Sequence, residues 1–445
     1  MKLRASTIAL AALLAPLPAH AAPDMPDFDV AASKAAIDAT LDQIYPHLDA
    51  VYRDIHAHPE LGFQEKRTAA LLAAEMRKLG FTATEGVGKT GIVAILRNGD
   101  GPTVMVRTEM DGLPMEEKTG LPFASRAQQD YNGALSFVDH SCGHDTHMAA
   151  WLGTAKILVD SKAKWHGTLI FVGQPAEEAL GGALAMIADG LFTRFPKPDV
   201  GFAAHAMSGT IGDVLIKDGT AMSAADAFAI TFNGVGAHGS MPDKSIDPIV
   251  MGGHFVTDVQ SVISREKEAA TFGVLTIGSF QAGSAPNIIS DKAELKLSMR
   301  SFDPATRQLL IDGVTRTANA VAAMARAPAP TIVHIGGTAA LVNDSALAAR
   351  ARTVMTTAFG TQAKFQSTLD RPNSASEDYS DFVAAGVPSM FYFVSGTDPK
   401  LAADYAAKGQ PVPTNHSPFF APLAEPTIRR IAETLALSVM MVAAK

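Results

Sequence analysis

The chain has one cysteine, Cys142, among 445 residues, so no disulfide can form within it. Only 18% of the residues are charged and 7% are aromatic, while 47% are apolar. This balance excludes a disordered, collagen-like or coiled-coil chain. An excess of positive charge is also missing, because 37 basic and 45 acidic residues give a formal net charge of −8, and this argues against nucleic acid as a partner. An enzyme or a small-ligand binder of two or three domains remains.

No stretch that could span a membrane follows the N-terminus. There, Lys2 and Arg4 precede an apolar run over residues 5–17, and residues 19–21 (AHA) offer small side chains at both recognition positions of a cleavage site. A membrane anchor is the less favoured alternative, because the run is shorter than the ~20 residues that a bilayer requires. We therefore expect a signal peptide over residues 1–21 and an exported, periplasmic mature protein without a membrane span.

The pattern of predicted elements changes twice along the chain. Strand-like runs alternate with helical patterns over the first half of the mature chain and again towards its end, which predicts an α/β layer with a mostly parallel central sheet. Between these parts, separated strands and two helices predict a smaller α+β domain. We therefore predict an α/β domain made of residues 22–214 and 331–445, interrupted by an inserted α+β domain over residues 215–330.

The densest group of reactive side chains is DHSCGHDTH at residues 139–147, which holds a thiol, three imidazoles and two carboxylates just before a predicted helix. Cys142 and His144 are two residues apart in a loop and can face one ion, and both ligand types suit zinc or its neighbours. The alternative is a buried cysteine beside solvated histidines.

A second group favours the metal interpretation. Glu177 and Glu178 directly follow a predicted buried strand at residues 168–172, where adjacent carboxylates are costly without cations. One carboxylate can ligate a metal while its neighbour takes a proton from water, as hydrolysis requires. The alternative is a solvated loop with two incidental acids. His205 ends the next predicted strand and His416 lies in a polar loop before the last helix, so four elements converge on one sheet edge.

Seven motifs, in this order, resemble those of the two-metal aminoacylase/carboxypeptidase metallopeptidases, in particular the amidohydrolase branch that contains hippurate hydrolase and the plant indole-acetyl-amino-acid hydrolases. Each motif alone is weak, but the ordered set covers nearly all of the mature chain. The motifs are HAHPELGF (56–63), RTEMDGLP (107–114), SCGHD (141–145), QPAEE (174–178), GVGAH (234–238), APNII (285–289) and SEDY (376–379).

The resemblance implies a cofactor of two divalent ions per subunit, zinc, manganese or cobalt, and a role for each matching residue. Glu177 would be the general base, and the inserted domain would supply His238 to polarise the scissile carbonyl. Asn287 and Arg300 would bind the carboxylate of the substrate, for which a guanidinium is well suited. The implied metal ligands are Cys142, His144, Glu178, His205 and His416.

Three features depart from the pattern of that family. Glu109 stands where aspartate is common, Ser141 replaces the usual alanine, and the segment 126–138 is longer than the usual connection. We expect Glu109, Asp111 and Asp145 to lie behind the ligands, because ligating imidazoles usually donate their other N–H to a carboxylate or a carbonyl. His140 and His147 have weaker claims to a role.

By this resemblance, the chain is expected to be a metal-dependent amidohydrolase that cleaves an N-acyl or N-aroyl amino acid, and to form a homo-oligomer. A dipeptidase or exo-carboxypeptidase with the same metals is the alternative enzyme. A binding protein that has lost catalysis would have a damaged acid pair or missing ligands, whereas Glu177, Glu178 and every expected ligand are present.

Overall fold

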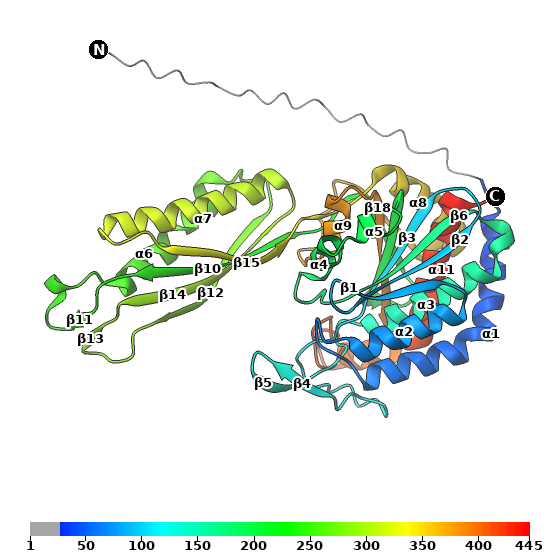
Figure 1. Cartoon of the computed structure of the whole chain (residues 1–445), viewed down its shortest axis with the longest axis horizontal. Coiled ribbons are helices and arrows are strands. Elements are labelled where there is room, and N and C mark those ends of the chain that lie inside the picture. Colours follow the sequence, from blue (N-terminus) through cyan, green and yellow to red (C-terminus); the bar gives the residue numbers. More distant parts are fainter. Residues whose placement is uncertain (1–26) are drawn as a thin grey trace, which may run out of the picture.

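The computed structural model describes residues 27–445, which form a large α/β domain and a smaller, elongated domain beside it (Figure 1). The expected signal peptide at residues 1–21 lies outside the described residues. Within residues 27–445, no helix is long and apolar enough to cross a membrane.

An eight-stranded sheet forms the centre of the large domain. Four of its seven strand pairs are parallel, including the three in its middle, so the predicted mostly parallel sheet is confirmed. Strand β6 is buried at every position, which is typical of a strand covered on both faces. In spatial order the strands are β1 (Thr82–Val87), β2 (Gly91–Asn98), β6 (Gly167–Gln174), β3 (Thr103–Glu109), β7 (Val200–Thr210), β18 (Ser389–Thr397), β8 (Val214–Lys217) and β17 (Ala363–Gln366).

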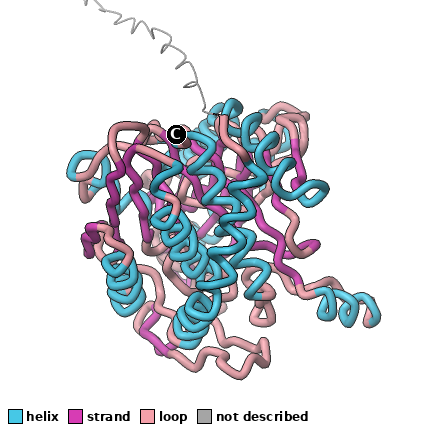
Figure 2. Tube along the Cα trace, turned by 90° about the vertical axis from the view of Figure 1, so that its right-hand side faces the viewer, coloured by secondary structure: helices cyan, strands magenta, loops and turns pink. Residues whose placement is uncertain are grey.

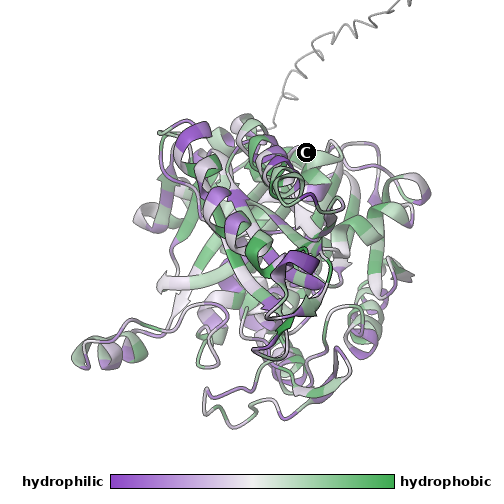
Figure 3. Ribbon diagram, turned by 90° about the vertical axis from the view of Figure 1, so that its left-hand side faces the viewer, coloured by the Kyte–Doolittle hydropathy of each residue, from purple (hydrophilic) through white to green (hydrophobic). Residues whose placement is uncertain are grey.

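Helices cover both faces of this sheet, because successive strand residues point to opposite sides and each side has its own apolar cluster. Figure 2 shows helices of the large domain in front of the strands. Figure 3, seen from the side of the inserted domain, shows that the helices carry both hydrophilic and hydrophobic residues, as amphipathic packing requires. The larger cluster contains α1 (Val30–Ala57), α2 (Lys66–Lys78), α3 (His144–Asp160), α8 (Ser345–Phe359) and α11 (Ala424–Ala443). The smaller contains α4 (Gly182–Ala188), α5 (Leu191–Arg194) and α9 (Ser380–Ala384). Helix α10 (Pro399–Ala407) has no buried residue.

The smaller domain is built on an antiparallel sheet with the order β12-β14-β10-β15. Strand β14 alternates between exposed and buried residues, as expected for a sheet whose core lies on one face, where two helices pack. Its elements are β10 (Ala224–Asn233), α6 (Pro248–Asp258), β12 (Gly273–Ala282), β14 (Lys292–Ser301), α7 (Pro304–Met324) and β15 (Thr331–Thr338).

The limits of this inserted domain differ from the expected 215–330 at both ends. Strand β8 runs past residue 215 and belongs to the large sheet, whereas β15 lies beyond residue 330 and belongs to the second sheet. The chain passes between the two domains twice, and a short antiparallel pair of strands, β9 (Gly219–Met222) with β16 (Leu341–Asn343), connects these two segments. The pair β11 (Ala237–His238) and β13 (Ile288–Ile289) lies at the end of the inserted domain farthest from the large domain (Figure 1).

The long segment 126–138 forms a β-hairpin of β4 (Gln128–Tyr131) and β5 (Ala134–Phe137). Its two-residue turn has positive φ at both Asn132 and Gly133, the geometry that matches the twist of a hairpin. The extra length of this connection is therefore an ordered hairpin.

Candidate functional site

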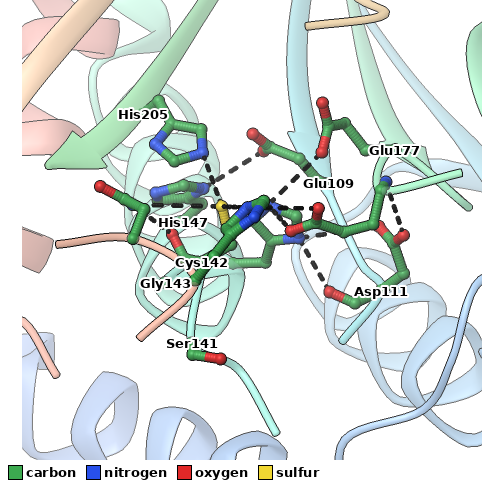
Figure 4. Close-up of polar contacts among 12 residues, drawn as sticks. Glu109, Asp111, Ser141, Cys142, Gly143, His147, Glu177 and His205 are labelled. Carbon is green, nitrogen blue, oxygen red and sulfur yellow. Dashed lines mark hydrogen bonds and ion pairs between the residues drawn. The ribbon is translucent and has the colours of Figure 1, made fainter. Parts of the chain in front are cut away.

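Six of the predicted site residues lie together beside the large sheet, where they come from four separate elements. Figure 4 shows Cys142, Glu177 and His205 facing one another at this place. Strand β7 continues to Thr210, so His205 lies within the strand and not at its end as predicted. Five of the six line a cavity of about 340 Å³ and the sixth, His144, is buried behind it. The six are Cys142, His144, Glu177, Glu178, His205 and His416.

The donor atoms of these side chains form two overlapping groups that share Glu178. In one group, Nε2 of His416 lies 3.3 Å from Sγ of Cys142 and 3.3 Å from Oε2 of Glu178. In the other, Nε2 of His144 lies 3.9 Å from a carboxylate oxygen of Glu177 and of Glu178. Nε2 of His205 lies 3.4 Å from the same sulfur atom. Two groups joined by one carboxylate suit two neighbouring cations.

Hydrogen bonds fix the imidazoles of His144, which is buried, and His205, which is half-buried, so that Nε2 faces the site. Nδ1 of His144 donates to the carbonyl oxygen of Asp111 at 2.8 Å, and Nδ1 of His205 donates to that of Ala206 at 2.7 Å. Nε2 is therefore the ring nitrogen left to face an ion, and within residues 27–445 Nε2 of His144 and Oε1 of Glu178 are buried without a hydrogen-bond partner. Buried donors and acceptors are rarely left in this state, so the residues present fit a bound metal.

The two adjacent glutamates have pKa values shifted in opposite directions. Burial raises the pKa of Glu177 well above its usual range, and the neighbouring carboxylates of Glu377 and Glu178 raise it further. Burial opposes ionisation of Glu178 as well, but His416 and His144 hold the pKa of this carboxyl below its usual value. Such a divergence separates a proton carrier from a permanently ionised group.

Burial, followed by the charges of Glu178 and Glu177, raises the pKa of Cys142 well above its usual range. A thiolate at this position therefore needs a cation beside it, since a coordinated thiol is deprotonated.

Three loop residues of the site have a left-handed backbone. They are Gly143 with φ +89°, Ala176 with φ +48° and His416 with φ +67°. Gly143 is also the residue before α3, so its conformation turns the chain between Cys142 and His144. Side-chain-bearing residues in this region cost free energy and persist only where the surroundings hold them, which happens most often at functional sites.

The acids expected behind the ligands have different partners. Asp111 contacts a candidate ligand through its carbonyl group, and its carboxylate accepts from the backbone N–H of Glu178 at 3.0 Å. The carboxylate of Glu109 lies 3.3 Å from Nδ1 of His147, whose Nε2 accepts from the backbone N–H of Ala206. His147 thereby fixes β7 beside His205. His140, by contrast, is buried, and neither of its ring nitrogens has a hydrogen-bond partner within residues 27–445.

Asp145 belongs to a buried ion cluster that was not predicted from the sequence. Nδ1 of His56 lies 2.6 Å from its carboxylate, and Nε2 lies 3.1 Å from that of Glu117. Burial opposes the charged imidazole, but these two carboxylates raise the pKa of His56 to about 10. The cluster fastens the end of α1 to the start of α3.

A second unidentified cluster surrounds Arg107, which is fully buried beside the acid pair. Its guanidinium lies 2.8 Å from Glu109, 2.7 Å from Glu377 and 3.4 Å from Asp378. The carboxylates of Glu377 and Asp378 also lie close to that of Glu177. Arg107 and Glu377 both fall in motifs that the sequence analysis noted, but 270 positions separate them and only the fold shows their contact.

The inserted domain contributes one predicted residue to the cavity and holds two others away from it. Arg300 lines the cavity and donates to the hydroxyl of Ser376, and within residues 27–445 its guanidinium has no carboxylate at ion-pair distance. His238 and Asn287 instead line a separate, shallow hollow at the tip of the inserted domain, and no residue of the large domain lines it. Nδ1 of His238 accepts from the backbone N–H of Ser240, and its partner at 2.7 Å is the hydroxyl of that residue.

Comparison with known proteins places the chain among metallohydrolases. A family model described as peptidase family M20/M25/M40 matches residues 105–421. Hippurate hydrolase of Campylobacter jejuni is 38% identical over 276 residues, which make up 62% of this chain and 69% of that enzyme.

Two solved structures share the fold over nearly their whole length. The crystal structure of an aminohydrolase from methicillin-resistant Staphylococcus aureus has a TM-score of 0.80 and 28% identity, and the match covers 92% of this chain and 99% of that one. A Bacillus subtilis protein described as a dinuclear metal binding peptidase of the M20 family has a TM-score of 0.69 and 25% identity, with 90% and 99% covered.

Proposed function

Because this chain belongs to peptidase family M20/M25/M40, and is therefore a metal-dependent hydrolase of amide bonds with two divalent ions, we propose that it hydrolyses N-acyl or N-aroyl amino acids. The products are a free amino acid and a carboxylic acid. The observation that carries this proposal is the composition of one cavity, which combines an acid pair, a guanidinium without an ion-pair partner within residues 27–445, and a partly apolar wall.

The cavity matches the three parts of such a substrate. Arg300 is half-buried and has a neutral hydroxyl as its partner, so a substrate carboxylate supplies the missing charge through a bidentate contact. One part of the wall is apolar and suits an apolar acyl or aroyl group, whereas the α-ammonium of a free dipeptide requires an acceptor, which only the polar lining, such as Asn373 and Glu377, offers. The apolar wall residues are Leu180, Met207, Met222 and Phe393.

We assign the two ions to Cys142, His144, Glu178, His205 and His416. When bound, they lower the pKa of water and polarise the scissile carbonyl. Glu177 takes a proton from the attacking water and returns it to the leaving nitrogen, a role supported by its raised pKa and its place on the cavity wall. Arg300 holds the substrate by its carboxylate, so that the amide bond lies beside Glu177.

We further propose that His238 and Asn287 act on substrate in the cavity lined by Glu177, although neither residue lines this cavity in the single chain. Either the inserted domain closes over its own cavity, or the tip of a second copy reaches it in a homo-oligomer. Mixing the variants His238→Ala and Glu177→Gln distinguishes these arrangements, because activity returns in the mixture only if the tip of one copy serves the cavity of another. Light scattering on the same sample gives the oligomeric state.

Export to the periplasm also remains a proposal, based on the residues that precede Pro23. It predicts a secreted protein whose first residue is Ala22. N-terminal sequencing of protein recovered from the cells that produce it tests this, and a retained Met1 contradicts it.

The function itself is tested with a panel of N-acyl amino acids, assayed by mass spectrometry with the purified enzyme loaded with Zn²⁺, Mn²⁺ or Co²⁺. The panel pairs each N-benzoyl amino acid with the free dipeptide that ends in the same residue. We expect the benzoyl compound to be hydrolysed faster in each pair. Preference for the dipeptides overturns the proposal in favour of a peptidase, and no hydrolysis of either set with any metal overturns both.

A further inference from the structure

The residue before the proposed general base has an unfavourable backbone conformation. Ala176 lies between Pro175 and Glu177 and has φ +48°, in the left-handed region. For a residue with a Cβ atom this region is unfavourable, because the Cβ atom comes too close to the carbonyl oxygen that follows. Ala176 lies between the end of β6 and the acid pair, so its conformation sets the direction of the chain at Glu177 and Glu178, which have different partners.

Hydrogen bonds hold the backbone of Ala176 on both sides: its carbonyl oxygen accepts from the backbone N–H of Gly182 at 3.2 Å, and its own N–H donates to Glu65. One oxygen of the Glu65 carboxylate accepts from the backbone N–H of Ala176 at 2.8 Å, and the other accepts from the hydroxyl of Thr90 at 2.5 Å. Its side chain is fully buried, and Glu65 does not line the cavity. It stands directly before α2, yet makes no side-chain cap for that helix. The side chain is thus used for the loop that carries the acid pair.

Gly62, three residues earlier, leaves room for the methyl group of Ala176. A Cβ atom built on Gly62 would lie 3.0 Å from that of Ala176, closer than nearly all real contacts of this kind. Glu65 and Gly62 therefore form a seat for Ala176, which we call the Ala176 seat. On the other side of Glu177, the backbone N–H of Glu178 donates to Asp111, so the loop is held both before and after the base.

We propose that Glu65 is a positioning residue that fixes the conformation of Ala176 and so aims the carboxylate of Glu177 into the cavity. This inference rests on the proposed role of Glu177 as the general base. It assigns a positioning role to Gly62, in the first motif, and to Glu65, two residues beyond that motif, although neither lines the cavity. Without the hydrogen bond, Ala176 relaxes toward negative φ and Glu177 turns away, while Glu178 stays in place through Asp111.

The kinetic test compares Glu65→Ala, Glu65→Gln and a matched control, Glu60→Ala, on the best substrate of the panel. Glu65→Gln keeps an oxygen to accept from Ala176, and its amide can donate to Thr90. The carboxylate of Glu60 accepts two backbone N–H groups in the same segment, those of Arg67 and Thr68, and within residues 27–445 it makes no hydrogen bond or ion pair to a residue of the site. The control thus removes comparable hydrogen bonds away from the loop.

We expect Glu65→Ala to lower kcat at least 30-fold with KM changed less than threefold, and the bound metal to remain at the wild-type level. Glu65→Gln should restore kcat to within fivefold of the wild type, and Glu60→Ala should stay within threefold. A Glu65→Ala enzyme within threefold of the wild type overturns the proposal, as does a loss that Glu60→Ala shares or that Glu65→Gln fails to restore.

A second measurement separates this inference from the proposed function. In the metal-free protein, hydrogen exchange followed by mass spectrometry reports on residues 174–182 without any substrate. Exchange at Ala176 should be at least tenfold faster in Glu65→Ala than in the wild type and Glu65→Gln. If exchange at Ala176 is faster in Glu65→Ala but no N-acyl amino acid is hydrolysed, the proposed function is wrong, whereas the role of Glu65 in fixing Ala176 is supported. If exchange does not respond, the inference fails whatever the enzyme hydrolyses.

A pair of uncharged variants keeps the idea testable if Glu65→Ala does not fold. Gly62→Ala adds a methyl group against that of Ala176 and should lower kcat about tenfold. The double variant Gly62→Ala/Ala176→Gly removes the opposing methyl group, and glycine adopts positive φ without strain. It should therefore recover most of the lost activity. An unaffected Gly62→Ala enzyme, or a double variant no better than the single one, contradicts the proposal.

Discussion

The site beside the large sheet and the tip of the inserted domain carry the two halves of the proposed active centre, and they are built differently. Around the cavity, the charged side chains are buried and tied to one another, as with Arg107 among its carboxylates and His56 between Asp145 and Glu117. At the tip, His238 is exposed, and its only side-chain hydrogen-bond partner within residues 27–445 is the serine two positions later.

This difference suggests two kinds of site residue: charged side chains around the cavity that must be held in place, and an exposed side chain, His238, that must be brought to the substrate. A buried site can shift pKa values and exclude water, but each of its charges depends on the others for stability. An exposed side chain has little effect on folding and can meet a substrate only after a movement or an encounter. We therefore expect variants at the cavity to affect stability, activity or both, and variants at the tip to affect activity alone.

The largest effect should come from His56→Ala, which leaves two buried carboxylates without their cation. Breaking a buried pair in this way typically costs about 3–5 kcal/mol. The pKa of His56 is raised to about 10 in the folded protein. Its stabilising contribution is therefore complete below the unfolded value near 6.5 and is lost as the pH rises from there to about 10.

Urea unfolding of the metal-free protein at pH 6 and pH 9.5 measures this difference. The gap between wild type and variant should be wide at pH 6 and narrow at pH 9.5. His58→Ala is the control, because His58 lies two residues away and is half-exposed. If His56→Ala and His58→Ala lower the free energy of unfolding equally, the buried cluster of His56 does not contribute the expected stability.

Glu177→Gln should follow, with kcat lowered at least ~10²-fold, or about 2.7 kcal/mol, because the proton carrier is lost. Metal content should stay at the wild-type level, since the neighbouring Glu178 is the proposed ligand. The control is Glu178→Gln, which should lose metal. Metal analysis and turnover on the same preparations test both, and the reverse pattern means that the roles of the pair are exchanged.

Arg300 links the two regions, because it belongs to the inserted domain but lines the cavity of the large domain. The variant Arg300→Ala tests its contact with the substrate. In the wild type, the free acid of a substrate should be preferred to its amide by roughly 10- to 100-fold in kcat/KM, which corresponds to a charge-assisted contact of ~1.5–3 kcal/mol. The variant should lose most of this preference, and the melting temperature should stay within a few degrees.

Arg316→Ala provides the comparison, because Arg316 is an exposed residue of the same domain that pairs with Glu266. It should keep the wild-type preference for the acid. A preference that survives in Arg300→Ala leaves the carboxylate contact to another residue.

The fold was largely predictable because its strands have distinct patterns. The buried runs that became β6 and β7 are each evident from local sequence. The hairpin of β4 and β5 was not predicted, although its turn signal, Asn132-Gly133, is present between the two strands. Its residues are mostly polar or exposed, so no alternation marked them as strands.

Within the site, local motifs predicted which residues are reactive but not which of them touch. The candidate ligands converge as expected, because the fold brings four elements to one place. The partners of Arg107 and the role of Glu65 depend on contacts across 270 and 111 positions, which no local pattern encodes. The position of His238 was equally hidden, since it depends on how the inserted domain is oriented.

The smallest effect concerns the hydroxyl of Ser240, which lies 2.7 Å from Nδ1 of His238. The backbone N–H of Ser240 donates to the same nitrogen, so the proton of a neutral ring lies on Nε2. An Nε2–H group is the donor needed to polarise a carbonyl. Ser240→Ala removes one exposed hydrogen bond but leaves the backbone donor.

We therefore expect kcat/KM to fall only two- to tenfold in Ser240→Ala, equivalent to about 0.5–1.5 kcal/mol. The melting temperature should not change. Ser245→Ala, which removes a hydroxyl bonded to the carbonyl of Pro242 in the same loop, should leave kcat/KM unaltered. Steady-state kinetics with one N-benzoyl substrate and thermal melts of all three proteins test the comparison. A clear loss of melting temperature in Ser240→Ala would show that the tip is held by its own contacts as the cavity is. The distinction between a cavity held by buried contacts and an exposed, loosely held tip would then be wrong.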